Sequence, residues 1–257
     1  MTRVAFIGFG EAGGLIAEGL RGAGADVRSA YDILIDDGRL GPALADRARA
    51  LGITATRTAA DAVDGADIIV SAVTCEEIAA AAASVASALR AGQIYLDINS
   101  ASPKAKREAA GVIEPSGAAF VEAAVMDLVP PHGHEVPMLL AGARAHDTQE
   151  LLRPYGMNVT AIGDTIGQAS AVKMVRSVFM KGFSAILLEC LIAAAKLGAE
   201  KPVLDSLQTS YPELDWHDLA DRSTTRLVQH AKRQSAEMLS VAETLEELGI
   251  EPITALA

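Results

Sequence analysis

A glycine-rich turn near the start of the chain constrains its fold more than any other feature. Residues 4–7 are apolar and predict a buried strand, and Gly8, Gly10 and Gly13 follow at Gly-x-Gly-x-x-Gly spacing before a helical pattern. In such a turn the first glycine makes the bend, the second lets a pyrophosphate approach, and the third lets helix pack on strand. The helix N-terminus also favours phosphate. We therefore expect dinucleotide contacts from Gly8, Phe9, Gly10, Glu11, Ala12 and Gly13.

An acidic residue follows the second predicted strand. Residues 26–31 form that strand and Asp32 ends it, about 20 residues beyond the last glycine, where a carboxylate binds a ribose 2′-hydroxyl. Because the carboxylate would repel a 2′-phosphate, NAD is the expected cofactor. NADP stays the alternative, since Arg39 could reach back. A glycine-rich turn without any ligand is the competing interpretation.

Composition excludes several classes of protein. The 257 residues carry a net charge of −11, which argues against a nucleic-acid binder because a basic surface is missing. The start lacks a signal-peptide pattern, and the apolar residues 182–195, interrupted by Ser184 and Glu189, are expected to be too short for a bilayer. Cys75 and Cys190 are isolated, which favours reduced thiols and a cytoplasmic location. The histidine spacing predicts no metal site.

Strand and helix patterns alternate along the first two-thirds of the chain, which predicts crossover units and a parallel sheet. Ser102 and Pro103 form an N-cap pattern for one of the helices. After residue 163 the pattern is helical, with long helices expected at 170–197 and 223–248. We predict an α/β fold: a doubly wound parallel sheet of Rossmann type (1–162) followed by an all-helical domain (163–257). The expected strands are 3–8, 26–31, 53–57, 67–73, 93–98, 119–121, 136–141 and 158–162.

Several segments together resemble the β-hydroxyacid dehydrogenase superfamily, which includes 6-phosphogluconate and 3-hydroxyisobutyrate dehydrogenases. The resemblance covers nearly the whole chain and points to a little-characterised subgroup. It implies a Rossmann domain, a helical domain that dimerises, and one catalytic lysine. The segments that carry it are 6–13, 65–73, 97–103, 122–125, 163–173 and 248–250.

The family's catalytic lysine falls on Lys173, but Ser177 stands where the family has asparagine four residues later. Lys173, Ser177, Lys181 and Ser184 recur at helical spacing on an otherwise apolar helix. Such a stripe is either a solvated edge or a site. A partly desolvated lysine there would have a lowered pKa and exchange a proton with a carbinol oxygen. Ser177 could bond the same oxygen, and Arg176 could hold an anionic substrate.

The turn Asp97-x-Asn99-Ser100 is similar to the family's Asp-x-Ser-Thr turn. The resemblance places Ser100, with Asn99 nearby, beside the ribose and nicotinamide of the cofactor. An Asx turn or N-cap is an equal alternative. Val73 and Thr74 end the preceding strand, and their backbone is expected to touch the cofactor.

Two further segments depart from the family pattern. The glycines that offer amides to a substrate carboxylate are replaced by Met126 and Asp127, which favours a bulkier or less charged substrate over a short hydroxy acid, with a plain loop as the alternative. On the last long helix the family's lysine is missing. His230, Arg233 and Glu237 lie on one helical face instead, as an anion site or an exposed salt-bridged stripe.

These features predict an NAD(P)-dependent oxidoreductase that moves a hydride between nicotinamide and the carbinol or carbonyl carbon of a small, hydroxy-acid-like metabolite. Lys173 would act as acid and base. An imine reductase on the same scaffold and a non-catalytic NAD(P)-binding regulator are the alternatives. A homodimer is expected, because residues 182–195 are too apolar to face water.

Overall fold

The computed structural model describes residues 1–256, apart from the side chains of residues 226–233 and 236. Its contacts divide the chain into two compact units, Met1–Lys173 and Met174–Ala257. The division falls inside the long helix α8 (Gln168–Leu197), so this one element contributes to both units.

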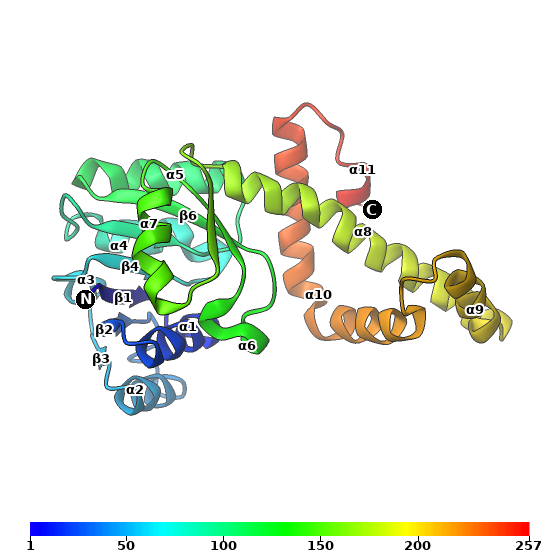
Figure 1. Cartoon of the computed structure of the whole chain (residues 1–257), viewed down its shortest axis with the longest axis horizontal. Coiled ribbons are helices and arrows are strands. Elements are labelled where there is room, and N and C mark those ends of the chain that lie inside the picture. The colour runs from blue at the N-terminus through cyan, green and yellow to red at the C-terminus, as the bar shows by residue number, and fades with distance from the viewer. Residues whose placement is uncertain (257) are drawn as a thin grey trace. The chain divides into compact units, whose positions relative to one another are not determined.

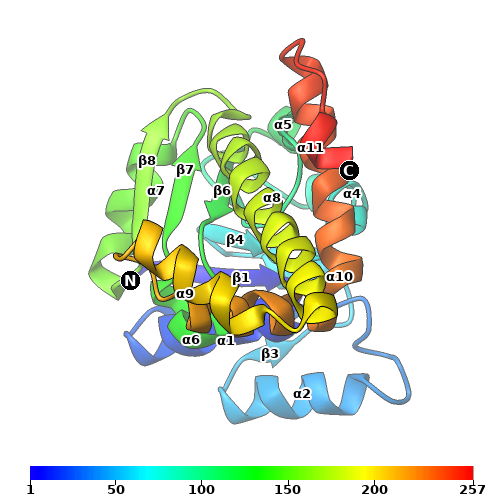
Figure 2. The ribbon, with the colours of Figure 1, turned by 90° about the vertical axis from the view of Figure 1, so that its right-hand side faces the viewer.

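The first unit is built on an eight-stranded sheet of order β3-β2-β1-β4-β5-β6-β7-β8 (Figures 1 and 2). Order and direction confirm the doubly wound sheet, and the chain reverses its direction of winding between β1 and β4. Ile7 pairs with Ser71 and Ser71 with Asp97, so the carboxyl ends of β1, β4 and β5 meet at one edge. The strands are β1 (Arg3–Ile7), β2 (Asp26–Tyr31), β3 (Thr54–Ala55), β4 (Ile68–Ser71), β5 (Ile94–Asp97), β6 (Ala119–Val125), β7 (Met138–Ala141) and β8 (Val159–Gly163).

One pair departs from the expected parallel sheet: β6 and β7 run antiparallel. The chain between them holds only α6 (Val129–His132) and η3 (Gly133–Glu135). Segments this short cannot make the crossover that parallel neighbours require, whereas antiparallel neighbours need only a short connection.

Helices cover both faces of the sheet because each central strand is apolar on both sides. In β1, Val4 and Phe6 pack in one core with α1, while Ala5 and Ile7 pack in the other with α4 and α5. The Ser102 hydroxyl caps α5 by accepting from the Ala105 N–H, and Pro103 is its first residue, which confirms the cap pattern. The helices are α1 (Glu11–Gly22), α2 (Gly41–Ala50), α3 (Ala59–Val63), α4 (Ile78–Ala86), α5 (Pro103–Ile113) and α7 (Ala145–Leu152), with 3₁₀ turns η1 (Cys75–Glu77), η2 (Glu114–Ser116) and η4 (Arg153–Tyr155).

The second unit is helical, as predicted, and holds the rest of α8 with α9 (Glu200–Ser210), α10 (Trp216–Glu247) and α11 (Ile253–Leu256). Helix α10 begins at Trp216 rather than at residue 223, because the Asp215 side chain caps it by accepting from the Asp218 N–H at 3.0 Å. Trp216 then packs with Leu187 and Leu204 in a small core.

Helix α8 also revises the argument about membranes. It has 30 residues, and an 18-residue segment of it has a mean hydropathy of 1.8. By length and composition alone, this is enough to cross a bilayer. The sequence argument judged only the apolar residues 182–195, which are too few to cross a bilayer. The whole helix is longer than that stretch, so its length alone does not exclude a membrane span. Only 17% of that 18-residue segment is buried within the chain, so the apolar surface needs another explanation.

Candidate cofactor site

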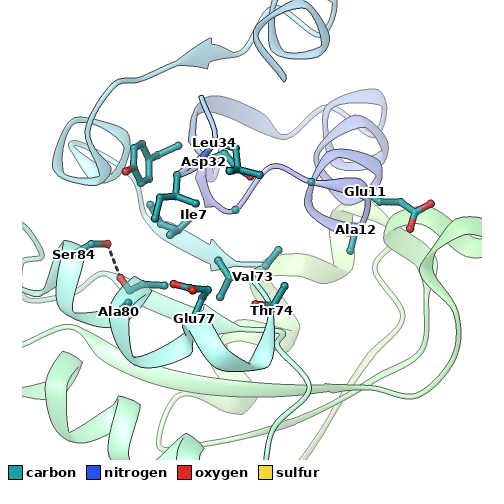
Figure 3. A pocket seen from close by; sticks show the side chains of 16 residues that line it. Ile7, Glu11, Ala12, Asp32, Leu34, Val73, Thr74, Glu77, Ala80 and Ser84 are labelled. Carbon is teal, nitrogen blue, oxygen red and sulfur yellow. Dashed lines mark hydrogen bonds between the residues drawn. The ribbon is translucent and has the colours of Figure 1, made fainter. Parts of the chain in front are cut away.

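A cavity of about 400 Å³ opens at the carboxyl edge of the sheet, where β1, β2 and β4 end (Figure 3). Gly8 and Gly10 of the glycine turn line it, Asp32 and Leu34 lie on one side, and Val73 and Glu77 lie on the other. The lining is mostly apolar, with a few carboxylates. The geometry matches the rule that open α/β sheets bind ligands at the point where the winding direction reverses.

The three glycines differ in whether a side chain would fit at their position, and the differences agree with the role of each glycine in dinucleotide binding. Gly8 has φ +90°, and a Cβ there would collide with the carbonyl of Ala72, so the tight turn needs glycine. A Cβ on Gly13 would collide with the Gly8 carbonyl, which makes close packing of helix on strand depend on it. A Cβ on Gly10 would meet nothing within 4 Å, and Gly10 lines the cavity. Its backbone is therefore open to a pyrophosphate, so the residues present fit the predicted cofactor.

Backbone amides hold the Asp32 carboxylate at the cavity wall. Its Oδ2 accepts from the Phe9 N–H at 2.8 Å, and its Oδ1 accepts from the Leu34 N–H at 2.9 Å. Each oxygen keeps a lone pair for a ribose hydroxyl. Glu11 and Glu77 also line the cavity, and its described lining contains no lysine or arginine.

Asn99 joins the loops that follow β4 and β5. Its Oδ1 accepts from the Val73 N–H at 2.6 Å, and its Nδ2 donates to Ser71 Oγ at 3.0 Å. Its own N–H donates to Asp97 Oδ1 at 2.9 Å, which forms an Asx-turn contact with Asp97 as the acceptor. The side chain is 4% exposed, so its amide is committed to the protein. Val73 and Thr74 do line the cavity, and the buried Oγ of Ser100 has no hydrogen-bond partner among the described residues.

The first turn of α8 is anchored to the sheet by a buried carboxylate. Glu122 is fully buried on β6, and its Oε1 accepts from the N–H groups of Gly167 and Ala169 at 2.7 and 2.9 Å. Its Oε2 accepts from Ser170 Oγ at 2.7 Å. Lys173 follows within the same stretch of helix and is half-buried.

The polar stripe on α8 is partly formed by contacts within the second unit. Lys181 Nζ donates to Ser177 Oγ at 3.3 Å and pairs with Glu237 of α10 at 2.9 Å. Ser177 is 6% exposed, whereas Arg176 is exposed. Glu237 therefore pairs across to α8. The side chains of His230 and Arg233 lie outside the described residues.

The loop after β6 places Met126 and Asp127 in different surroundings. Met126 is half-buried and its N–H donates to the Pro137 carbonyl at 2.8 Å. Asp127 is exposed, and its Oδ2 lies 3.5 Å from His132 Nε2 on α6. An apolar side chain and a carboxylate beside an imidazole replace the backbone amides that the family offers there.

Sequence reasoning missed two basic residues near the cofactor loops. Arg47 of α2 donates to the Gly10 carbonyl at 2.8 Å, and Lys106 of α5 pairs with Asp97 at 2.7 Å. No spacing rule connects these residues to the turns that they contact, because both contacts depend on how the helices pack. The one sequence signal for Lys106 was its position on the face of a predicted helix that was expected to be buried.

Comparison with known proteins agrees with this geometry. Residues 3–101 match the family described as NADP oxidoreductase, coenzyme F420-dependent, and residues 194–257 match a domain of unknown function, DUF1932. A conserved hypothetical protein from Sinorhizobium meliloti is 42% identical, with 99% of this chain and 85% of that chain covered and a TM-score of 0.82. A conserved protein of unknown function, reported as structurally similar to 3-hydroxyacid dehydrogenases, is 35% identical over 98% of this chain and 93% of its own, with a TM-score of 0.78.

The chain belongs to the β-hydroxyacid dehydrogenase superfamily. The 3-hydroxyisobutyrate dehydrogenase of Mycobacterium tuberculosis, 21% identical over 99% of this chain and 90% of its own, shares the fold with a TM-score of 0.78. The first matched region contains the glycine turn, Asp32 and the Asn99–Ser100 turn, so NAD(P) is the cofactor of this superfamily member. The predicted family and two-domain fold are thereby confirmed.

Proposed function

We propose that this protein is a dehydrogenase that transfers hydride between NAD(H) and the carbinol or carbonyl carbon of a small polar metabolite, with Lys173 as the acid and base. The observation that carries the proposal is the cavity at the glycine turn, whose open Gly10 and fixed Asp32 fit a dinucleotide. The bound nicotinamide supplies the hydride chemistry. The chain itself supplies binding, orientation and a proton.

Lys173 is proposed for the proton because of its surroundings. It is half-buried in the helical segment that Glu122 fixes to β6, so its Cα position is set by the sheet. A lysine held in a fixed position can donate or accept a proton as a general acid or base. When carbonyl is reduced, the ammonium donates its proton to the forming alkoxide; in the reverse direction the amine accepts it.

The altered loop argues for a substrate other than a short hydroxy acid. Met126 offers apolar surface, and the exposed carboxylate of Asp127 repels an anion placed beside it. We therefore propose a substrate with an uncharged or cationic group at this end. The same loop also keeps open the second candidate, a dinucleotide-binding regulator without turnover.

Oxidation of NADH across a panel of ketoacids, semialdehydes and cyclic imines tests the proposal. Turnover of a carbonyl compound, lost in Lys173→Met, would support it. Turnover of cyclic imines alone would assign an imine reductase instead. Tight NADH binding with no turnover of any compound would favour the regulator.

A further inference from the structure

A fully buried ion pair lies next to the cofactor loops without lining the cavity. Lys106 Nζ on α5 is 2.7 Å from Asp97 Oδ1 at the end of β5, and also donates to the Asp97 carbonyl at 3.2 Å. The side chains are 1% and 0% exposed. Removing two charges from water costs so much that a buried pair of this kind adds little net stability. Stability alone therefore does not account for it.

The pair is one end of a hydrogen-bond chain that reaches the cavity wall. Asp97 Oδ1, which accepts from Lys106, also accepts from the Asn99 N–H. The Asn99 side chain then takes the Val73 N–H on Oδ1 and donates to Ser71 Oγ. Val73 itself lines the cavity. A contact on α5 thus fixes both loops that leave β4 and β5.

These two loops belong to the half of the sheet opposite Asp32. A doubly wound sheet binds one mononucleotide on each side of the reversal, and the acidic residue after β2 marks the adenosine side. The loop after β5 therefore serves the nicotinamide side, whereas Val73, on the loop after β4, also lines the cavity that contains Asp32. We propose that Lys106 is a positioning residue that presets these loops for the nicotinamide half, which deepens the proposed function and rests on it.

The physical reason is the shared acceptor. Without the ammonium group, the buried Asp97 carboxylate is left as an uncompensated charge and must take up a proton or turn away. Either change weakens the acceptor of the Asn99 N–H. The Asn99 side chain then loses its fixed orientation, and so does the Val73 N–H that it holds. The glycine turn and Asp32 make none of these hydrogen bonds and still hold the adenosine half, so the larger loss of affinity falls on the nicotinamide half.

The test compares two ligands in one variant. Lys106→Met keeps the length and apolar stem of the side chain but removes its charge. Titration of the full chain should show NADH affinity reduced at least tenfold, with a clearly smaller loss of ADP affinity, so that the NADH-to-ADP ratio falls. Lys104→Met, the same change at an exposed position two residues away on α5, should alter neither affinity. A merely structural role for Lys106 would lower the melting temperature and leave the NADH-to-ADP ratio unchanged.

The double variant Asp97→Leu with Lys106→Met covers the case in which the single variant does not fold. Replacing a buried pair by apolar residues often restores stability. Since the Asn99 N–H still lacks its acceptor, NADH affinity should stay at least tenfold low. Wild-type NADH affinity in either variant would overturn the positioning role while leaving the proposed function intact. Wild-type protein that binds ADP but not NADH would overturn the proposed function and this role together.

Discussion

At the scale of single residues, the charge of Asp32 decides between the two nicotinamide cofactors. We expect wild type to bind NADH at least tenfold more tightly than NADPH, which corresponds to about 1.4 kcal/mol. Asp32→Asn keeps an oxygen for one backbone N–H but removes the charge, so the preference should fall to within about threefold. Fluorescence titration measures both ligands. Asp36→Asn, an exposed acid on the same loop, is the control. NADPH bound tenfold more tightly by wild type would contradict the assignment.

Lys173 carries the second prediction at this scale. If it transfers the proton, Lys173→Met should reduce turnover by roughly 10²–10⁴-fold, the usual contribution of general acid–base catalysis. NADH affinity should change little, because the cavity at the glycine turn does not include Lys173. Lys196→Met, an exposed lysine on the same helix, serves as the control in the same assay. Near-normal turnover in Lys173→Met would remove this residue from the mechanism.

The limits of sequence reasoning are also clearest in particular residues. Asp32 and the three glycines follow from spacing, since each acts through its own backbone or a fixed offset in one β-α-β unit. Lys106 and Arg47 do not, because each contacts a turn that belongs to another element. Asn99 was assigned to the cofactor by resemblance. Its amide is bonded to Val73 and Ser71, which depends on the register of β4 against β5.

At the scale of elements, Glu122 is the joint between β6 and α8. Glu122→Gln offers one acceptor oxygen where three donors converge, and its amide would face a donor. Losing hydrogen bonds to a buried charge should lower the free energy of unfolding by about 2 kcal/mol. Urea denaturation measures this, with the exposed Glu114→Gln as the control. An unchanged midpoint would show that α8 does not need this anchor.

The first residue of β1, Arg3, and the residue before β4, Asp67, provide a pH prediction. Arg3 bonds Asp67 through its guanidinium at 3.1 and 2.5 Å, and this lowers the pKa of the Asp67 carboxyl. A lowered folded-state pKa contributes stability above the ordinary value of about 3.9, and this is lost as pH falls through the lowered value. Asp67→Asn should therefore be less stable than wild type at pH 7. The two urea midpoints should converge as the pH falls below the lowered pKa of Asp67; a constant gap would contradict the linkage.

Element boundaries show where local patterns suffice. The strands of the first unit were predicted from apolar runs, because a sheet covered on both faces leaves such runs in the sequence. The antiparallel β6–β7 pair was not, since strand direction depends on what the connection can span. The start of α10 was missed because the Asp215 cap, rather than the later apolar pattern, sets it.

At the scale of the whole molecule, the apolar surface of α8 requires a partner. Phe179, Ile186 and Ile192 are 71%, 68% and 50% exposed, far more than large apolar side chains on a helix of this hydropathy tolerate in water. We expect a second copy of the chain to cover them, as the resemblance implies. Light scattering at micromolar concentration should report a dimer.

Substitutions in the exposed apolar side chains of α8 test which partner covers this surface. Phe179→Glu with Ile186→Glu places charges in the buried interface and should shift the equilibrium to monomer, raising the dimer dissociation constant at least a hundredfold, or about 2.7 kcal/mol. Val112→Glu, an apolar-to-acidic change on α5 of the first unit, should leave the dimer intact. The same proteins are mixed with phospholipid vesicles, because α8 is also long enough for a bilayer. A wild-type monomer that floats with vesicles, and loses this in Phe179→Glu with Ile186→Glu, would replace the dimer by a membrane as the partner of this helix.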